Sequence, residues 1–515
     1  MKMAVFAVLA ISAVLRLWSL GTPTTFVFDE VYYAKDAKAI IDGRLGQKQG
    51  GQAWEPGDLV SWPHPECGKL AIALGILAFG DTPFGWRFAP ALAGLALLAC
   101  VYPIARRLGL SRGWALGALV LAATDLLGIA QSRIATLDIF VALWTAVCVL
   151  LALKYVQDGH RLRWLALCGL AGGLAVSTKW SGALALLAAG VLLLLFRRCA
   201  PRQHVAAQEH TEPVPTARPR LWRALRASLP PILFLVALPA ALYVASYAFY
   251  FAAGHSFADW WEMQRQAFTF NFNLHATHSY ASEAPTWILN TRPVWYFFES
   301  KAEYHGIVAM GNPLLWWSSA LALVAVPAAA LLGRDRRLAV PALLVALLYF
   351  PWFATGRTSF LYYMTPVAPF LAILVATGLQ RLCGTPLRWP RRRPSLPCGV
   401  TETAFWPTLA FLAATAATTL FWHPVERGIG WLFWRVPASS SRLLGYVVAA
   451  AGGAFICALL GWLISHLRTL AGRQALAWSY VGVIAGLGIV FLPIVVDIGI
   501  SPERYYRLIW FTSWI

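Results

Sequence analysis

Long apolar runs separated by short polar segments dominate the chain, and this spacing predicts a bundle of membrane-spanning helices. The runs are roughly 18–22 residues long, the length that an α-helix needs to cross the hydrocarbon core of a bilayer. Candidate spans cover residues 3–20, 86–105, 113–130, 136–154, 164–178, 181–196, 230–250, 313–332, 338–354, 359–379, 403–421, 443–465 and 476–496. The pattern therefore predicts an all-α polytopic membrane protein of about 11–13 helices. The short apolar segment 70–80 is expected to lie along the membrane interface.

The distribution of Lys and Arg predicts how these helices are oriented. Basic residues concentrate on the cytoplasmic side of membrane proteins, which makes the N-terminus cytoplasmic here. Two long loops, 21–85 and 251–312, are then extracytoplasmic; they are rich in Trp, Tyr, His and Asn and are expected to form the working surface. The basic segments that set this orientation are 106–112, 155–163, 197–229, 333–337, 380–402 and 466–475.

Domain organisation follows from the same pattern. The whole chain, 1–515, is interpreted as one membrane domain that ends in the helices of 380–515. The segment 197–229 is rich in Pro, Gln and Ala and is expected to be a flexible cytoplasmic loop. The apolar run of residues 1–20 lacks a small-residue cleavage site, so it is interpreted as a retained helix rather than a signal peptide.

Composition narrows the function classes. Of the 515 residues, 59% are hydrophobic and only 13% are charged, whereas soluble domains carry about 25% charged residues. The net charge of +19 fits cytoplasmic loops that contact anionic lipid headgroups, and without a basic soluble module it does not indicate nucleic-acid binding. The eight cysteines are scattered without a CxxC motif, which argues against a zinc site and against a disulfide framework.

Two adjacent carboxylates, Asp29 and Glu30, follow the first apolar run, and a His-Pro turn with Lys69 comes later in the same loop. Charged groups near a membrane are costly and are usually retained for function. An anionic, lipid-linked substrate would explain both the carboxylates and the cations. Asp29 also fits the N-cap of a helix over 30–41, and the two interpretations are compatible because a capping carboxylate remains an acceptor.

Separated motifs occur in order from residue 28 to about residue 370. They are Phe28-Asp29-Glu30-Val31-Tyr32, His64-Pro65-Glu66-Cys67-Gly68-Lys69, Gly85-Trp86-Arg87-Phe88, Ser132-Arg133-Ile134-Ala135-Thr136-Leu137-Asp138, Lys179-Trp180-Ser181-Gly182, His278-Ser279-Tyr280-Ala281-Ser282, Arg292-Pro293-Val294-Trp295-Tyr296, Gly311-Asn312-Pro313-Leu314 and Phe360-Leu361-Tyr362-Tyr363. Together they resemble the bacterial, actinobacterial-type branch of the protein O-mannosyltransferase family, polytopic glycosyltransferases of the GT-C superfamily. The chain departs from the family pattern at Glu66-Cys67, where Pro-Leu is usual, and at Glu283-Ala284-Pro285, where Arg-Trp is usual.

The resemblance implies a GT-C type helix bundle that transfers mannose from polyprenyl-phosphate mannose to Ser or Thr hydroxyls of exported proteins, with inversion. It implies Asp29 as the general base, with Glu30 beside it. The implied partners are membrane lipid, the lipid-linked donor and unfolded exported polypeptides, and export would make the secretion translocon a partner as well. The implied location is the plasma membrane, with the catalytic loops outside.

A departing phosphate needs cations, and the candidates are expected at outer helix ends. Lys69 is the first of them, and Arg87, Arg133, Lys179 and Arg357 are the others; each could instead extend to lipid headgroups. His64 is interpreted either as a hydrogen-bond donor to the phosphate or as a turn residue.

Further polar and aromatic positions are assigned more loosely. His278, Tyr280 and Trp287 are the candidates on the acceptor side, and Trp260, Trp261 and Trp287 could border an acceptor groove. Asp138, at a helix start, is expected to cap that helix. His275 and His278 lack a third ligand at a known spacing, so neither a metal nor a cofactor other than the lipid-linked donor is expected.

Two alternatives remain open at this stage. The same donor chemistry could serve a lipid or cell-wall glycan acceptor. A protein of a different class, a lipid-linked sugar flippase or transporter, would favour discontinuous helices with charges at the membrane midplane. The polar residues cluster at one predicted face instead, which argues for the enzyme.

Overall fold

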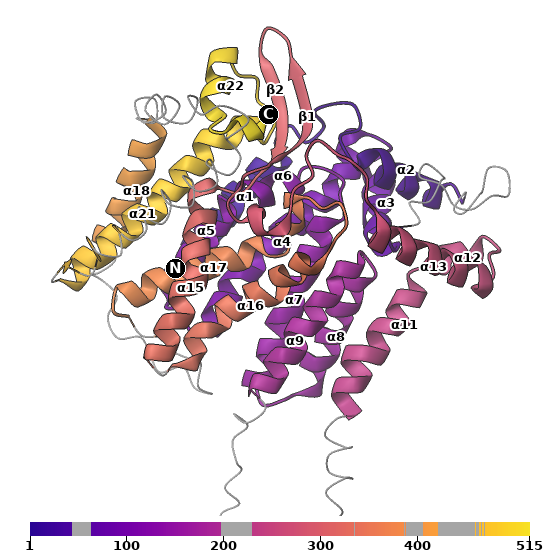
Figure 1. Cartoon of the computed structure of the whole chain (residues 1–515), viewed down its shortest axis with the longest axis horizontal. Helices are drawn as coiled ribbons and strands as arrows, with labels where there is room; N and C mark the ends of the chain where they lie inside the picture. Colours follow the sequence, from indigo (N-terminus) through magenta and orange to yellow (C-terminus); the bar gives the residue numbers. More distant parts are fainter. Residues whose placement is uncertain are drawn as a thin grey trace, which may run out of the picture.

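The computed structural model describes residues 1–43, 63–196, 229–333, 335–385, 387, 405–420, 459, 463–464, 466–467 and 469–515. These residues form a helix bundle, and the elements of the two long loops gather toward one end of it (Figure 1). The helices of the bundle include α1 (Lys2–Leu17), α4 (Pro83–Arg107), α5 (Arg112–Ala123), α6 (Leu126–Gln131), α7 (Asp138–Gln157), α8 (Leu162–Val176), α9 (Ala183–Phe196), α11 (Leu238–Ala245) after a π-helical turn (Leu233–Ala237), α15 (Pro313–Leu332), α16 (Val340–Tyr349), α17 (Ala368–Leu382), α18 (Phe405–Leu420) and α21 (Leu470–Phe491).

The helices follow the predicted spans closely. Within the described residues, 5 helical segments are long and apolar enough to cross a membrane: Pro83–Arg107, Asp138–Gln157, Pro313–Leu332, Arg337–Ala354 and Leu470–Ile494. Shorter apolar helices cover most of the other predicted spans. Most of the predicted span 443–465, and nearly all of the loop 197–229, lie outside the described residues.

The predicted span 113–130 is interrupted. Helix α5 ends at Ala123, and Asp125 then caps the short helix α6 by accepting a hydrogen bond from the Gly128 N–H at 3.4 Å. An N-cap side chain satisfies a free N–H at a helix start, and it therefore starts a new helix where hydropathy alone would continue the old one.

The first long loop contains α2 (Glu30–Ile41) and α3 (Cys67–Phe79). The second begins within α12 (Ala248–Ala252) and contains α13 (Phe257–Asn273), α14 (Ala284–Trp287) and an antiparallel hairpin of β1 (Val294–Ser300) and β2 (Tyr304–Ala309). The hairpin was not predicted, although Val, Trp, Tyr and Phe dominate β1 and favour strands. It is joined to the C-terminal part of the chain, where the Tyr304 N–H donates to the Ile500 carbonyl at 2.8 Å.

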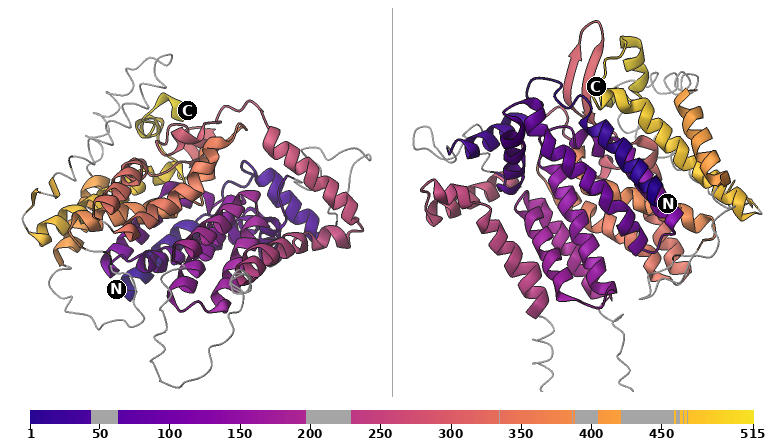
Figure 2. Two further views of the ribbon diagram at one scale, coloured as in Figure 1. Left: turned by 60° about the horizontal axis from the view of Figure 1, so that its bottom comes forward. Right: turned by 180° about the vertical axis from the view of Figure 1, so that it is seen from behind.

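The loop elements form a cap over one end of the bundle. The hairpin and α22 (Pro502–Leu508) lie over the part formed by α21, whereas α2, α3 and α13 lie over the part near α8 and α11 (Figures 1 and 2). The view from behind shows the same arrangement. This cap brings together residues that are hundreds of positions apart in the sequence, and it contains the candidate site.

Candidate active site

Asp29 stands at the start of α2, as the capping interpretation expected, but its side chain caps nothing. It occupies the N-cap position without a side-chain hydrogen bond to the helix. The preceding residue, Phe28, has a φ of 50°, an uncommon conformation for a non-glycine residue that turns the chain sharply before Asp29. Across the described part of the chain, the half-buried Asp29 carboxylate makes no hydrogen bond or ion pair. No contact among those residues competes with a substrate for this carboxylate.

The surroundings of Asp29 shift its protonation toward neutral pH. Burial raises its pKa to about 7, the nearby Asp138 carboxylate adds to the rise, and the Lys179 ammonium opposes it. A carboxyl group in a desolvated site holds its proton more tightly, because burial disfavours the charged form. A general base is most effective with a pKa near the working pH, so this environment suits proton abstraction.

Glu30, the neighbouring carboxylate, is fully engaged. Its two oxygens accept from the Nε and Nη2 atoms of Arg87, each at 2.8 Å, in a buried bidentate pair. They also accept from the backbone N–H groups of Val27 and Ala135, each at 2.9 Å. With all four acceptor positions filled, Glu30 has no lone pair directed at a substrate.

Arg87 is equally saturated. Beyond Glu30, it donates to the carbonyls of Leu20 at 3.3 Å, Pro23 at 2.8 Å and Thr25 at 3.1 Å. These contacts use all five N–H groups of the guanidinium. In this structure Arg87 ties the turn segment 20–25 to the start of α2 and so positions Asp29; its predicted role at the phosphate stays a prediction.

Lys69 is also occupied. Its buried ammonium lies 3.0 Å from the Glu66 carboxylate and 3.3 Å from that of Asp36. Glu66 is one of the residues at which the chain departs from the family pattern, so the departure supplies a counter-ion to Lys69. Two carboxylates on one ammonium leave no net positive charge for an anionic ligand, and Lys69 joins α2 to α3 instead.

The Arg133 guanidinium donates hydrogen bonds to backbone carbonyls. It donates to the carbonyls of Leu15 and Trp18, each at 2.8 Å, and more weakly to that of Val496 at 3.4 Å. These carbonyls belong to the end of α1 and to the segment after α21. Arginine near a helix C-terminus satisfies carbonyls that have no partner within the helix. The expected role in phosphate binding does not fit this arrangement.

Lys179 is the cation whose charge lowers the pKa of Asp29. Its ammonium lies 3.0 Å and 3.1 Å from the two Asp138 oxygens and over the rings of Tyr363 at 4.7 Å and Tyr362 at 5.9 Å. Asp138 was expected to cap α7, but Leu137 is the N-cap residue and the Asp138 side chain pairs with Lys179 instead. The ammonium keeps a third N–H beyond the two that face Asp138.

His64 and Arg357 are both half-buried. Together with Asp29, Asp138 and Lys179 they form what is called the polar cluster below. Burial lowers the pKa of His64 well below its usual value, and the charges of Lys179, Lys69 and Arg357 lower it further. His64 is therefore neutral at pH 7 and offers one donor and one acceptor. Arg357 donates through Nη1 to Asn271 at 2.8 Å and through Nε to the Thr358 carbonyl at 3.4 Å, and no contact within the described residues uses its Nη2 group.

The acceptor-side candidates have different surroundings. His278 is exposed and packs edge-on against Phe360, while Tyr280 is half-buried under Arg292. Trp287 is fully buried and its indole donates to the Ser282 carbonyl at 3.1 Å, so in this structure its side chain presents no surface to a groove. No role was predicted for Tyr362 and Tyr363, although the two adjacent tyrosines belong to the motif Phe360-Leu361-Tyr362-Tyr363.

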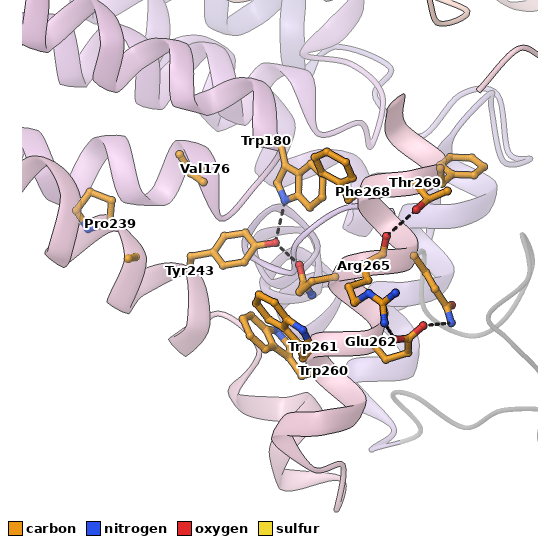
Figure 3. A pocket seen from close by; sticks show the side chains of 14 residues that line it. Val176, Trp180, Pro239, Tyr243, Trp260, Trp261, Glu262, Arg265, Phe268 and Thr269 are labelled. Atoms are coloured by element: carbon orange, nitrogen blue, oxygen red, sulfur yellow. Dashed lines mark hydrogen bonds and ion pairs between the residues drawn. The ribbon is translucent and has the colours of Figure 1, made fainter. Parts of the chain in front are cut away.

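An apolar pocket of about 970 Å³ lies between α8, α11 and α13 (Figure 3). Trp180, Tyr243 and Phe268 are among its lining residues, together with Trp260 and Trp261. The Trp180 indole donates to the Tyr243 hydroxyl at 2.8 Å, and that hydroxyl donates to Gln264 at 2.5 Å. Trp180 directly follows Lys179, so the pocket adjoins the polar cluster.

Among the residues that the structure describes, no three His, Cys, Asp or Glu side chains gather in a way that could hold a metal ion. The sequence-based expectation of a site without metal stays a prediction.

The bundle with its polar cap has the fold of the membrane glycosyltransferases. The Saccharomyces cerevisiae protein O-mannosyltransferase Pmt1–Pmt2 complex bound to the sugar donor superposes with a TM-score of 0.67 at 13% identity, covering 100% of this chain and 92% of that one. ArnT from Cupriavidus metallidurans bound to undecaprenyl phosphate gives a TM-score of 0.51 at 18% identity, covering 94% and 76%.

Sequence comparison then gives the family. The model of dolichyl-phosphate-mannose-protein mannosyltransferases matches residues 72–254, and that of the C-terminal four-helix transmembrane region of protein O-mannosyltransferases matches residues 256–436. The chain belongs to the protein O-mannosyltransferase family, and it is a multi-pass membrane protein. Similar proteins include polyprenol-phosphate-mannose–protein mannosyltransferases of Mycolicibacterium smegmatis (29% identical, covering 82% of this chain and 88% of the relative) and Corynebacterium glutamicum (27%, covering 74% and 82%).

Proposed function

We propose that this protein transfers mannose from polyprenyl-phosphate mannose to Ser or Thr hydroxyls of exported polypeptides. The observation that carries the proposal is the Asp29 carboxylate, which has no partner among the described residues and is acted on by the charge of the Lys179 ammonium. The family and the names of the similar bacterial proteins support the donor and the class of acceptor.

In the proposed reaction, the acceptor hydroxyl oxygen attacks C1 of the mannose and Asp29 takes the hydroxyl proton. The bond between C1 and the phosphate oxygen breaks, and its electron pair leaves with the polyprenyl phosphate. Attack opposite the leaving group inverts the configuration at C1. Lys179 and Arg357 stabilise the departing anion, and neutral His64 donates one hydrogen bond.

The apolar pocket beside Trp180 gives the lipid part of the donor a place to bind. A polyprenyl chain in this pocket would bring its phosphate to the neighbouring Lys179, because Trp180 and Lys179 are consecutive. Aromatic and aliphatic lining suits an isoprenoid, whose binding comes from apolar surface removed from water. We propose that this end of the bundle is extracytoplasmic in the plasma membrane, where the secretion translocon would deliver unfolded acceptors.

The function is tested with the purified full-length protein in nanodiscs. We expect label from radioactive polyprenyl-phosphate mannose to appear on a Thr-rich peptide. Label on a glycolipid or a cell-wall glycan acceptor alone would redirect the acceptor assignment. Movement of intact donor across a sealed vesicle membrane, without transfer to any acceptor, would contradict the proposal in favour of a flippase.

The pH dependence of transfer is expected to report Asp29. The base must be deprotonated, and its pKa is raised from 3.8 to about 7, so kcat/KM should be half-maximal near pH 7 and fall as the pH drops below that. In the free enzyme, kcat/KM follows the ionisation of the essential base. A profile that stays flat from pH 5 to pH 8 would contradict this role.

Two variants should move this midpoint in opposite directions. Lys179→Met removes the charge that lowers the Asp29 pKa and leaves Asp138 unpaired, so the midpoint should rise. Asp138→Asn removes a charge that raises the pKa, so the midpoint should fall. Measuring kcat/KM against pH for both variants and the wild type checks the signs; a shift of both in the same direction would contradict the assignment of the titrating group.

A further inference from the structure

Asn271, in the last turn of α13, joins three separate segments through one side chain. Its Nδ2 atom donates to the Pro63 carbonyl at 3.0 Å and to the Ala267 carbonyl at 2.9 Å. Its Oδ1 atom accepts from the Arg357 Nη1 at 2.8 Å. An amide supplies donors and an acceptor from the same group, and a hydroxyl or a carboxylate could not reproduce this set.

The segments that Asn271 joins are parts of the polar cluster. Pro63 directly precedes His64, and Arg357 precedes the stretch that leads to Tyr362 and Tyr363 beside Lys179. The segment after Arg357 is held to the chain beyond α13 by two more bonds: the Thr358 N–H donates to the Leu274 carbonyl at 2.9 Å, and the Thr358 hydroxyl donates to the Ala276 carbonyl at 2.6 Å.

Helix α13 is itself fixed at the apolar pocket. Trp260, Gln264 and Phe268 all line that pocket, and Gln264 accepts from the Tyr243 hydroxyl of α11, which in turn accepts from the Trp180 indole (Figure 3). The helix therefore contacts the pocket along its length and carries Asn271 at its end. Functional groups placed on helices are held more accurately than groups on loops.

We propose that Asn271 is a positioning residue for mannosyl transfer, which holds the Arg357 guanidinium and the Pro63–His64 turn at the donor phosphate from a helix that lines the apolar pocket. The inference rests on the proposed function, because Arg357 must act on the donor phosphate. Asn271 itself touches no reacting atom in this scheme; it removes the freedom of a long side chain whose Nη2 group is available to a ligand. Preorganised donors stabilise developing charge without having to reorient during the reaction.

A double-mutant cycle with Arg357 tests this relation. A hydrogen bond to a charged group is worth about one to two powers of ten in an equilibrium, so we expect Asn271→Ala to raise the donor KM about tenfold and Arg357→Ala to raise it about a hundredfold. The acceptor KM should not change. The double variant should raise the donor KM by clearly less than the product of the two single effects, because Asn271 acts mainly through Arg357 and only in part through the Pro63–His64 turn. Multiplied effects in the double variant would overturn the inference.

Asn273→Ala is the matched control. Asn273 is exposed in the same turn of α13, and its side chain makes no hydrogen bond within the part of the chain described, so its donor KM should equal that of the wild type. If Asn271→Ala fails to fold, Asn271→Asp keeps an acceptor for Arg357 but neutralises its charge, and it should raise the donor KM while the acceptor KM stays unchanged. An active wild type whose Asn271 variants all behave like Asn273→Ala would refute the inference alone. A wild type that transfers no mannose would refute the proposed function instead.

Discussion

Asp29→Asn is expected to lower kcat for mannosyl transfer by about 100- to 10,000-fold, the usual contribution of a general base. The amide has nearly the same shape as the carboxylate but cannot accept the hydroxyl proton. Because the Asp29 side chain makes no hydrogen bond or ion pair within the described residues, its replacement should leave the thermal unfolding of the protein unchanged. Steady-state transfer to a Thr-rich peptide and a thermal melt in nanodiscs measure the two quantities separately.

The matched control for this variant is Asp81→Asn. Asp81 is an exposed carboxylate in the turn between α3 and α4, away from the polar cluster, and its neutralisation should affect neither quantity. If Asp29→Asn retains a kcat within a few-fold of the wild type, Asp29 is not the base and the proposed mechanism fails. A stable variant with normal donor binding and lost turnover is the result that the structure predicts.

Arg87→Met is expected to act on stability rather than on chemistry. It leaves the Glu30 carboxylate buried without its counter-ion, and breaking a buried pair in this way typically costs about 3–5 kcal/mol. The three carbonyls of Leu20, Pro23 and Thr25 lose their donors at the same time. We expect a large fall in the melting temperature and in the amount of folded protein in the membrane.

The partner variant Glu30→Gln sharpens this test. If the two residues act as one structural unit, the double variant Glu30→Gln with Arg87→Met should be less destabilised than the sum of the single variants. Each single variant leaves one isolated buried charge, whereas the double variant leaves none. The alternative, in which Arg87 binds phosphate, predicts something else: a normal melting temperature and a donor KM that rises for Arg87→Lys. That result would contradict the positioning role.

Much of the fold could be predicted from the sequence because membrane spans depend on local hydropathy. The segments 86–105, 136–154 and 313–332 all appear as helices with ends within a few residues of those expected. Local hydropathy could not show the break at Asp125, which depends on a cap, or the hairpin of β1 and β2, whose aromatic residues resemble those of interfacial helices.

The candidate site was harder to predict because each cation was judged without its partner. Glu30 and Arg87 are separated by 57 residues, and Lys179 and Asp138 by 41. The sequence could therefore identify which charges lie in functional motifs, but not which of them neutralise one another. The structure separates Asp29, whose carboxylate has no partner in the described segments, from Glu30, whose carboxylate is saturated, although the two are adjacent in the chain.

Glu66, where the chain departs from the family motif, is another residue whose charge partner could not be predicted from the sequence. In the sequence it was one unusual residue in a motif, with no indication of its effect. In the structure its carboxylate lies 3.0 Å from the Lys69 ammonium and removes that cation from the set available to an anion. Lys179 and Arg357 are left as the cations with unused donors in the described cluster.

Rescue of Asp29→Ala by formate is the most direct test of the proposal that Asp29 takes the proton from the acceptor hydroxyl. Formate can enter the space left by the side chain and serve as a substitute base. The account predicts that added formate restores part of the mannosyl transfer by Asp29→Ala, but none of that lost in Lys179→Met. A variant that binds the donor with wild-type affinity yet gains no transfer at any formate concentration would contradict it.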